Sequence, residues 1–76
     1  MIRDELDVID QKCPIPIIKI SSVIKTLAVG QELLVKANDP VFKPDIEAWC
    51  RKTGNLLVEF SDVNTHFEAV IKKVIE

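Results

Sequence analysis

The residue best suited to chemistry is Cys13, in the segment Lys12-Cys13-Pro14-Ile15-Pro16. Proline suits the first turn of a helix, because its missing N–H has no intrahelical partner there. We therefore expect a helix that has Pro14 as its first or second residue and Cys13 at its start. Unpaired backbone N–H groups and the positive end of the helix dipole favour a thiolate at this place. Cys13 is thus a candidate nucleophile.

Charged residues near Cys13 act on its pKa in opposite directions. Lys12 favours the thiolate, whereas Asp10 and Asp39 would oppose it if they lie close, so the sequence leaves the net shift of the pKa open. The structural alternative is that Cys13 is only a small apolar residue at a helix start. A buried structural cysteine does not need two flanking prolines, and this favours the functional interpretation.

The other candidate side chains have simpler interpretations. Cys50 lies one helical turn after Ile46 and beside Trp49, which is typical of a buried core thiol. His66 could serve as the base of a Cys-His pair, but nothing in the sequence brings it to Cys13, and we expect a solvent-facing strand histidine. Two cysteines and one histidine cannot fill a tetrahedral zinc site unless carboxylates or a second subunit contribute. We expect no metal and no cofactor.

The composition indicates one small domain over residues 1–76, with 47% apolar and 29% charged residues. A net charge of -2 provides no global basic field for nucleic acid, and no direct nucleic-acid binding is expected. The acidic start Met1-Ile2-Arg3-Asp4-Glu5 does not resemble a signal peptide, and no apolar run approaches membrane-spanning length. We expect a cytosolic protein whose two thiols stay reduced, with no membrane association.

Hydrophobic periodicity predicts four strands and two helices. The strands are expected at residues 5–9, 32–37, 55–61 and 66–74, and the helices at 14–28 and 44–53. Pro44 sets the start of the second helix, because a residue before proline is pushed out of the α region. The last two strands form an antiparallel hairpin around a loop at 62–65. This order predicts an α/β two-layer sandwich, β-α-β-α-β-β, with a four-stranded mixed sheet covered on one face by two helices.

The same periodicity predicts which faces are buried. The first helix has an apolar stripe of Ile17, Ile20, Ile24 and Leu27, which Ile18, Val23 and Ala28 widen. In the last strand Phe67, Ala69 and Ile71 share one face, as expected for a sheet covered on one side. The predicted core comprises Leu6, Val8, Ile20, Ile24, Leu27, Leu34, Ile46, Trp49, Leu57 and Phe67.

Three further segments accompany the cysteine motif. Leu6-Asp7-Val8 precedes it, Ala37-Asn38-Asp39-Pro40 ends the second strand, and Asp45-Ile46 begins a helix that ends with an aromatic residue and Cys50. With these segments the chain resembles, over its whole length, the TusA (SirA-like) sulfur-carrier family. In that family the motif cysteine carries a persulfide supplied by a cysteine desulfurase or another sulfurtransferase. The sulfur is delivered to pathways such as tRNA thiolation, molybdenum cofactor assembly or sulfur oxidation.

The resemblance implies that Cys13 is the sulfur carrier, a sulfurtransferase-type role that needs no histidine or metal. Many family members have a glycine three residues before the cysteine, where this chain has Asp10. A first alternative is a thiol redox module in which Cys50 resolves an oxidised Cys13. A second is a regulatory interaction module without sulfur transfer. For the carrier we expect Cys13 at the surface, and Lys12 and Lys19 on the surface that docks a donor or an acceptor sulfurtransferase.

Overall fold

The computed structural model describes residues 4–74. Six elements follow one another along the chain. They are β1 (Asp4–Asp7), α1 (Ile15–Ile24), β2 (Glu32–Ala37), α2 (Phe42–Thr53), β3 (Leu56–Asp62) and β4 (Phe67–Lys72). This is the predicted order β-α-β-α-β-β.

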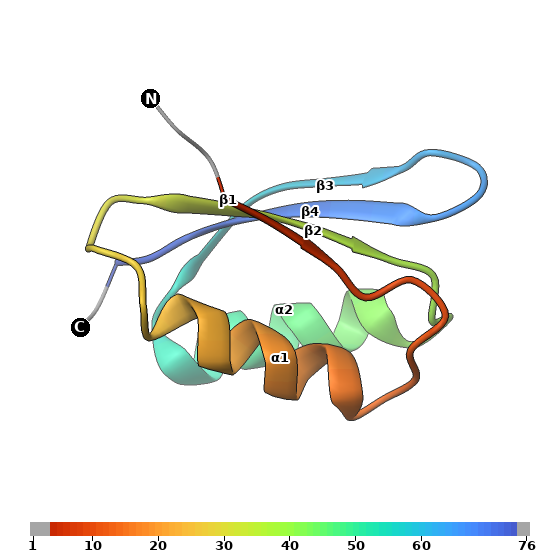
Figure 1. Cartoon of the computed structure of the whole chain (residues 1–76), viewed down its shortest axis with the longest axis horizontal. Helices are drawn as coiled ribbons and strands as arrows, with labels where there is room; N and C mark the ends of the chain where they lie inside the picture. The colour runs from red at the N-terminus through yellow and green to blue at the C-terminus, as the bar shows by residue number, and fades with distance from the viewer. Residues whose placement is uncertain (1–3, 75–76) are drawn as a thin grey trace.

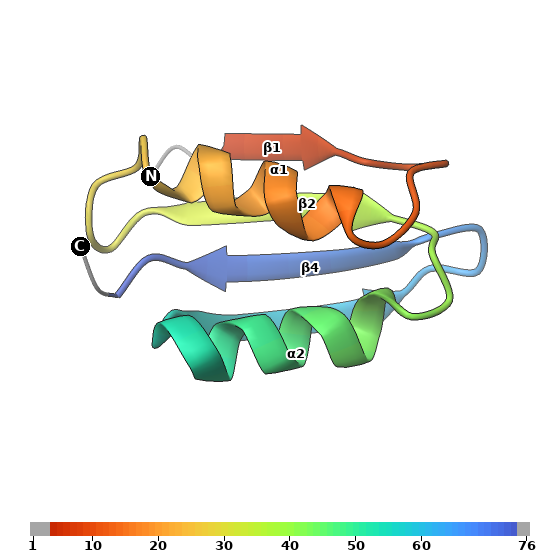
Figure 2. The same ribbon diagram turned by 90° about the horizontal axis from the view of Figure 1, so that it is seen from below.

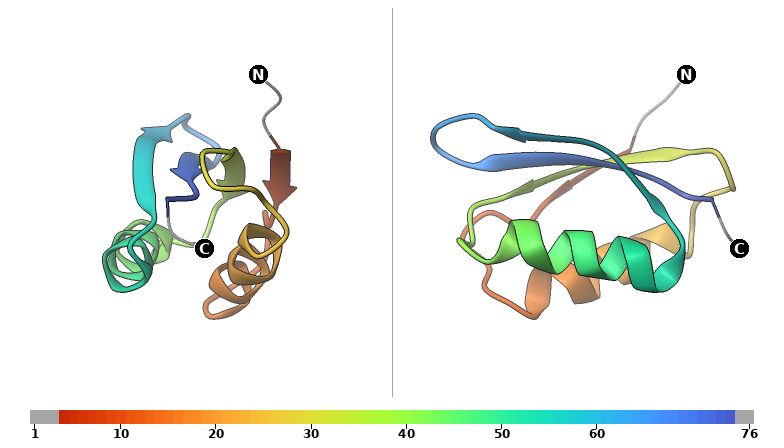
Figure 3. Two further views of the ribbon diagram at one scale, coloured as in Figure 1. Left: turned by 90° about the vertical axis from the view of Figure 1, so that its left-hand side faces the viewer. Right: turned by 180° about the vertical axis from the view of Figure 1, so that it is seen from behind.

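The four strands form one mixed sheet in the order β1-β2-β4-β3. β1 pairs with β2 in parallel, and β4 is antiparallel to both β2 and β3. Both helices lie beneath the same face of the sheet (Figure 1), where they run side by side in the same direction (Figure 2). The end-on view of Figure 3 shows the two layers. The predicted α/β two-layer sandwich is therefore confirmed.

The parallel pairing of β1 and β2 decides where the loops lie. The carboxyl ends of both strands therefore lie at the same end of the sheet. The loops that lead to α1 and α2 leave the sheet there, next to each other. The turn of the β3–β4 hairpin lies at this end of the sheet as well, on the right in Figure 1. Three loops that are far apart in the sequence thus meet at the end of the molecule where Cys13 lies.

Half of the ten predicted core residues are buried between the helices and the sheet, and four more pack against this core. Val8, Ile20, Ile24, Leu27 and Ile46 are buried. The half-buried residues that pack against this core include Leu6, Trp49, Leu57 and Phe67.

Leu34 was assigned to the core, and this prediction was wrong. Burial alternates along β2, with Leu33, Val35 and Ala37 buried against the helices. Leu34 faces the other side of the sheet, opposite Val70. In a continuous apolar run, apolar and polar residues do not alternate, so the run does not indicate which of its residues face the helices.

α1 is shorter than predicted at both ends. Its first residue is Ile15, so that Pro14 is the N-cap and Pro16 lies in the first turn. At the other end, Thr26 N–H and Leu27 N–H bond to carbonyls three residues back, and the Thr26 hydroxyl also donates to Val23 O at 2.7 Å. These tighter bonds end the helix at Ile24 rather than at residue 28.

The outer part of the predicted α1 stripe was also misassigned. Ile18 is 54% exposed, and Ala28 is exposed as well. The buried face consists of Pro16, Ile20 and Ile24. Ile18 lies at the margin of the stripe, and Ala28 lies beyond the end of α1.

α2 begins two residues before the predicted start. Lys43 is helical although it precedes Pro44, because Pro44 falls in the first turn, where proline is tolerated. The predicted C-terminal cap is confirmed, since Gly54 has a φ of 85° and its N–H donates to Cys50 O at 2.9 Å. Apart from β2, the predicted strands differ from the observed ones by one or two residues at each end.

A buried lysine joins the end of β4 to the turn after α1. The Lys73 ammonium donates to Leu27 O at 2.7 Å, and its backbone bonds to Gly30 and Gln31. Lys73 is 8% exposed, so this hydrogen bond is shielded from water. Within residues 4–74, neither helix has the length and apolar character needed to cross a bilayer.

Candidate functional site around Cys13

The loop that carries Cys13 is held by the loop that follows β2. Asp10 N–H donates to Asn38 Oδ1 at 2.7 Å, and Asn38 Nδ2 donates back to Asp10 Oδ1 at 3.0 Å. Cys13 N–H donates to Asp39 Oδ2 at 2.7 Å. Three hydrogen bonds between the β1–α1 and β2–α2 loops therefore fix the backbone on both sides of Lys12.

Asp39 connects Cys13 to the start of α2. Its Oδ1 accepts from Val41 N–H at 3.2 Å, and its backbone carbonyl accepts from Phe42 N–H at 2.9 Å. The residue is only 9% exposed. A buried carboxylate that accepts two backbone N–H groups is well satisfied, and it holds its donors firmly. Asp39 thus sets the position of the Cys13 backbone.

Asp10 adopts a left-handed backbone conformation, with a φ of 68°. Aspartate and asparagine are among the few residues that tolerate this region without being glycine. The chain can therefore make the same kind of sharp turn at Asp10 that a glycine would allow. Its carboxylate is also engaged by Asn38, so the charge does not point freely at the thiol.

Cys13 is exposed and forms no disulfide, and its exposure agrees with the expectation for a carrier. Its pKa is raised above the ordinary value of 9.0, mainly because the Asp45 side chain accepts a hydrogen bond from the thiol, and further because of partial desolvation and the charges of Asp45 and Asp39. The sequence left the direction of the net pKa shift open, and the structure shows that the groups opposing the thiolate outweigh the helix start. Cys13 precedes the N-cap Pro14, outside the helix, and two carboxylates oppose its ionisation.

Asp45 is a residue of the site that sequence reasoning missed. It was placed in α2 without a role, because nothing local links it to a cysteine thirty-two positions earlier. One feature could have indicated that Asp45 lies near Cys13. Asp45 is in the first turn of α2, and the strand before α2, β2, is parallel to β1. Helices that follow adjacent parallel strands begin at the same edge of the sheet.

Cys50 is a buried core thiol, as predicted. Burial raises its pKa to about 11. Cys50 lies five residues beyond Asp45, about 7.5 Å further along the helix axis. Cys13 is at the start of the helix pair and Cys50 near the end of α2, so the two thiols lie at different ends of the helix layer.

Thiol labelling tests this assignment of the two cysteines. A neutral alkylating reagent should modify Cys13 in the folded protein, with a rate that rises as the pH approaches the raised pKa of the thiol. Cys50 should react only in denaturant, because it is buried and protonated. Peptide mapping after timed labelling measures both rates. Labelling of Cys50 before Cys13 in the native protein would contradict the assignment.

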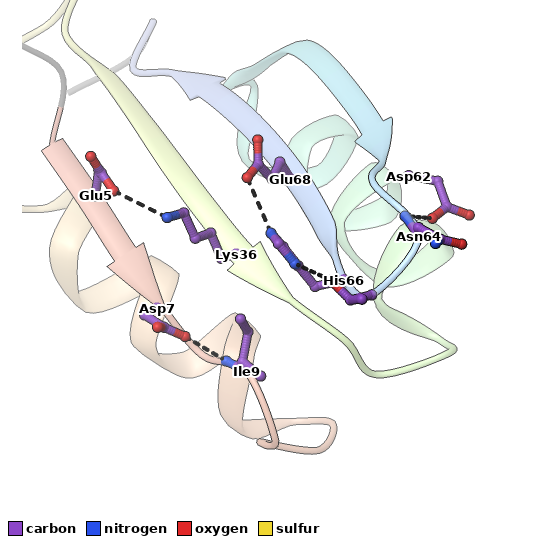
Figure 4. Close-up of polar contacts among 9 residues, drawn as sticks. Glu5, Asp7, Ile9, Lys36, Asp62, Asn64, His66 and Glu68 are labelled. Atoms are coloured by element: carbon purple, nitrogen blue, oxygen red, sulfur yellow. Dashed lines mark hydrogen bonds and ion pairs between the residues drawn. The ribbon is translucent and has the colours of Figure 1, made fainter.

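His66 is not a partner of Cys13. Its Nε2 lies 3.1 Å from Glu68 Oε2 and its Nδ1 lies 3.1 Å from Thr65 Oγ1. Figure 4 shows this pair on the sheet face away from the helices, near the hairpin. The prediction of a strand histidine outside the site is confirmed, except that His66 is half-buried and precedes β4.

The surface next to Cys13 has a small hollow, and exposed apolar residues lie close to it in the chain. A depression of about 140 Å³ is lined by Asp10, Gln11, Lys12, Asn38, Asp39 and Pro40. Ile15, Ile18 and Val41 are exposed nearby in the chain, at the starts of the two helices. Lys12 and Lys19 are also exposed. Among residues 4–74, no three His, Cys, Asp or Glu side chains group closely enough to hold a metal ion.

The sequence profile of the family described as Sulfurtransferase TusA matches residues 4–73. The chain belongs to this TusA family. One relative, the sulfur carrier protein TusA of Allochromatium vinosum, is 36% identical over 69 residues, which are 91% of this chain and 91% of that protein. A protein of Aquifex aeolicus is 34% identical over 71 residues, and the match covers 93% of this chain but only 36% of that longer protein.

A solved structure supports the TusA fold of the chain. The crystal structure of a SirA-like protein from Desulfitobacterium hafniense superposes with a TM-score of 0.80, covering 93% of this chain and 97% of that one, at 20% sequence identity. At this identity the likeness concerns the fold. The family assignment therefore rests on the sequence matches, and the arrangement of strands and helices agrees with it.

Proposed function

We propose that this TusA-family chain carries sulfane sulfur as a persulfide on Cys13 and passes it to a thiol of an acceptor protein. The observation that carries the proposal is an exposed thiol whose backbone is anchored by a buried carboxylate, at an edge of the sheet open to other proteins. A carrier has to present its sulfur to two different proteins in turn. Exposure allows both contacts, and the anchor keeps the sulfur in one place.

The exchange needs only thiol chemistry. The Cys13 thiolate attacks the outer sulfur of a donor persulfide, a new sulfur–sulfur bond forms, and the donor cysteine leaves as a thiolate. An acceptor thiolate then attacks the outer sulfur on Cys13, and Cys13 leaves in the same way. The number of sulfur–sulfur bonds is unchanged in each step, so no external oxidant or reductant is consumed.

The partners follow from this chemistry. A cysteine desulfurase or another sulfurtransferase would be the donor, and an acceptor sulfurtransferase of tRNA thiolation, molybdenum cofactor assembly or sulfur oxidation would receive the sulfur in the cytosol. Lys12 and Lys19 are exposed near the site and would contribute to docking. Opposite charges on a partner speed encounter more than they tighten the complex.

Incubation with a cysteine desulfurase and cysteine tests the proposal directly. Intact mass measurement should show the addition of one sulfur atom, and peptide mapping should place it on Cys13. The adduct should disappear on treatment with a reducing thiol, because the persulfide is transferred or reduced. No adduct with several different donors, while the thiol is shown to be free, would contradict the proposal.

The thiol redox alternative has a separate test. A disulfide requires Cα atoms within about 7 Å of each other, and Cys50 is buried near the far end of α2. We therefore expect peroxide treatment and non-reducing peptide mapping to give no link between Cys13 and Cys50. Formation of that link in the folded protein would favour the redox module over the carrier.

A further inference from the structure

A second hollow lies next to the one beside Cys13, at the same end of the sheet. Its volume is about 180 Å³, and its walls come from the residue after β2 and from the tip of the β3–β4 hairpin. The hairpin tip and the loop after β2 lie together on the right in Figure 1. The residues that line this hairpin hollow are Asn38, Asp62, Asn64, Thr65, His66 and Phe67.

Asn38 connects the hairpin hollow to the loop that carries Cys13. It lines both this hollow and the one of about 140 Å³ described above. Its side chain makes two hydrogen bonds with Asp10, at 2.7 and 3.0 Å. The next residue, Asp39, holds the Cys13 N–H. A group bound in the hairpin hollow therefore has a fixed position relative to the Cys13 backbone.

The hairpin tip is held in shape by its own hydrogen bonds. Val63 N–H donates to His66 O at 3.0 Å, and Thr65 N–H donates to Val63 O at 2.9 Å. Asn64 N–H donates to Asp62 Oδ1 at 3.0 Å, a bond that is drawn in Figure 4. The wall that the hairpin contributes is thus formed before a ligand arrives, which lowers the entropic cost of binding.

The hairpin hollow has an unpaired negative charge and an aromatic ring in its lining. Asp62 is the only carboxylate among the six lining residues. One of its oxygens accepts from Asn64 N–H, and within residues 4–74 its side chain forms no ion pair. Phe67 supplies the ring and is half-buried against the core. A ligand that suits this lining is positively charged and stacks on aromatic rings.

The positive groups near the hairpin hollow lie outside it or have partners. His66 is the one lining residue that can become positive, and its Nε2 lies 3.1 Å from Glu68 Oε2. Lys43 does not line the hollow, since its ammonium lies 5.7 Å from the centre of the Phe60 ring. Lys12 lines the neighbouring hollow instead. Within residues 4–74, the charge of Asp62 therefore has no cationic partner.

We propose that the hairpin hollow receives an arginine side chain of a protein that exchanges sulfur with Cys13. A guanidinium group is planar, binds a carboxylate through two N–H groups and stacks on aromatic rings. Asp62 and Phe67 offer these two contacts, and the side-chain oxygen of Asn64 offers a further acceptor. The inference rests on the function proposed above and adds the chemistry by which a partner is positioned.

The size of the hairpin hollow favours a side chain over a free ligand. Sites for small molecules usually have volumes of about 300 to 1,000 Å³, and this hollow is smaller. Asp62 is also exposed, and exposed ion pairs contribute little binding energy by themselves. A partner protein that already contacts the carrier elsewhere would bring its arginine at a high effective concentration. The arginine would then select the orientation in which the partner's cysteine reaches Cys13.

Disulfide-linked peptides test the hairpin hollow without a known partner. Each peptide has one cysteine, a spacer of two, four or six glycines, and either arginine or citrulline, the uncharged analogue of arginine. The peptides are supplied as mixed disulfides with 2-mercaptoethanol. The Cys13 thiolate attacks the sulfur of the peptide, a new sulfur–sulfur bond forms, and 2-mercaptoethanol leaves as a thiolate. Intact mass measurement at equilibrium gives the linked fraction, and peptide mapping assigns the link to Cys13.

The arginine peptide should be linked about two- to fivefold more than the citrulline peptide in the wild type, at the spacer lengths that reach the hollow. Asp62→Asn removes the charge and keeps an acceptor for Asn64 N–H, and should bring this ratio close to one. Glu59→Gln is the matched control. It removes a charge from the same strand, where Glu59 lies opposite Val70 on the sheet face away from the helices, and should keep the wild-type ratio.

Equal linkage of the two peptides to the wild type at every spacer length would overturn the inference, whether or not Asp62→Asn folds. A wild-type ratio in an Asp62→Asn protein that circular dichroism shows to be folded would overturn it as well. The peptide link forms whether or not Cys13 carries sulfur. An arginine preference without sulfur uptake from any donor would therefore refute the proposed function alone, and sulfur uptake without the preference would refute this inference alone.

Discussion

Cys13→Ser is expected to abolish both loading by a cysteine desulfurase and transfer to an acceptor, because a serine hydroxyl cannot form a persulfide. Intact mass measurement after incubation with donor and cysteine should show no added sulfur. The free energy of unfolding should change by less than about 0.5 kcal/mol, since the side chain is exposed and its backbone N–H still bonds to Asp39.

Cys50→Ala is the matched control for this experiment. It removes the other thiol of the chain, which is buried, and should leave sulfur addition at the wild-type level. Sulfur addition to Cys13→Ser, or its loss in a folded Cys50→Ala protein, would show that the wrong cysteine has been chosen. A Cys13→Ser protein that kept its activity in cells would favour the interaction module.

Ile20→Ala should lower the free energy of unfolding by about 2 to 5 kcal/mol, because it leaves a cavity under the sheet. The Ile20 side chain is 0% exposed, in the centre of the face that α1 turns toward the sheet. A 76-residue domain has roughly 4 to 11 kcal/mol of stability in total. The substitution therefore removes a large share of it, which urea denaturation followed by circular dichroism would measure.

Ile18→Ala makes the same chemical change two residues away, where the side chain is 54% exposed. Its free energy of unfolding should stay within about 0.5 kcal/mol of the wild type. Because both substitutions replace isoleucine by alanine in one helix, the difference in helix propensity cancels between them. Equal destabilisation by the two variants would show that the packing face of α1 is misassigned.

The features that sequence predicted well depend on short-range rules. Two prolines placed the start of α1 within one residue, and the spacing of Ile46 and Cys50 placed both on the buried face of α2. The burial of Cys50 followed from this local assignment, whereas the exposure of Cys13 was expected from the carrier role. The helix start and the burial of Ile46 and Cys50 each need only the geometry of one helix.

The features that sequence missed depend on contacts between distant segments. The Cys13 N–H bonds to the carboxylate of Asp39, twenty-six positions later. The pKa of the thiol is raised mainly by Asp45, six positions beyond Asp39. From the sequence, Asp39 could be said to oppose the thiolate only if it lies close to Cys13, and Asp45 was not predicted to lie near the thiol. The direction of the pKa shift depends on how close these two carboxylates lie to Cys13. The parallel pairing of β1 with β2 brings the segments that contain them together.

The position of β4 has a consequence for synthesis on the ribosome. β4 is made after the other five described elements, yet it lies between β2 and β3, inside the sheet. A nascent chain that lacks it has no partner for the inner edge of β2, and the buried link from Lys73 to Leu27 is missing as well. The end of the sheet that presents Cys13 is therefore completed only after translation has passed residue 73. A truncated chain would lack the folded surface at which we propose that a sulfur donor docks.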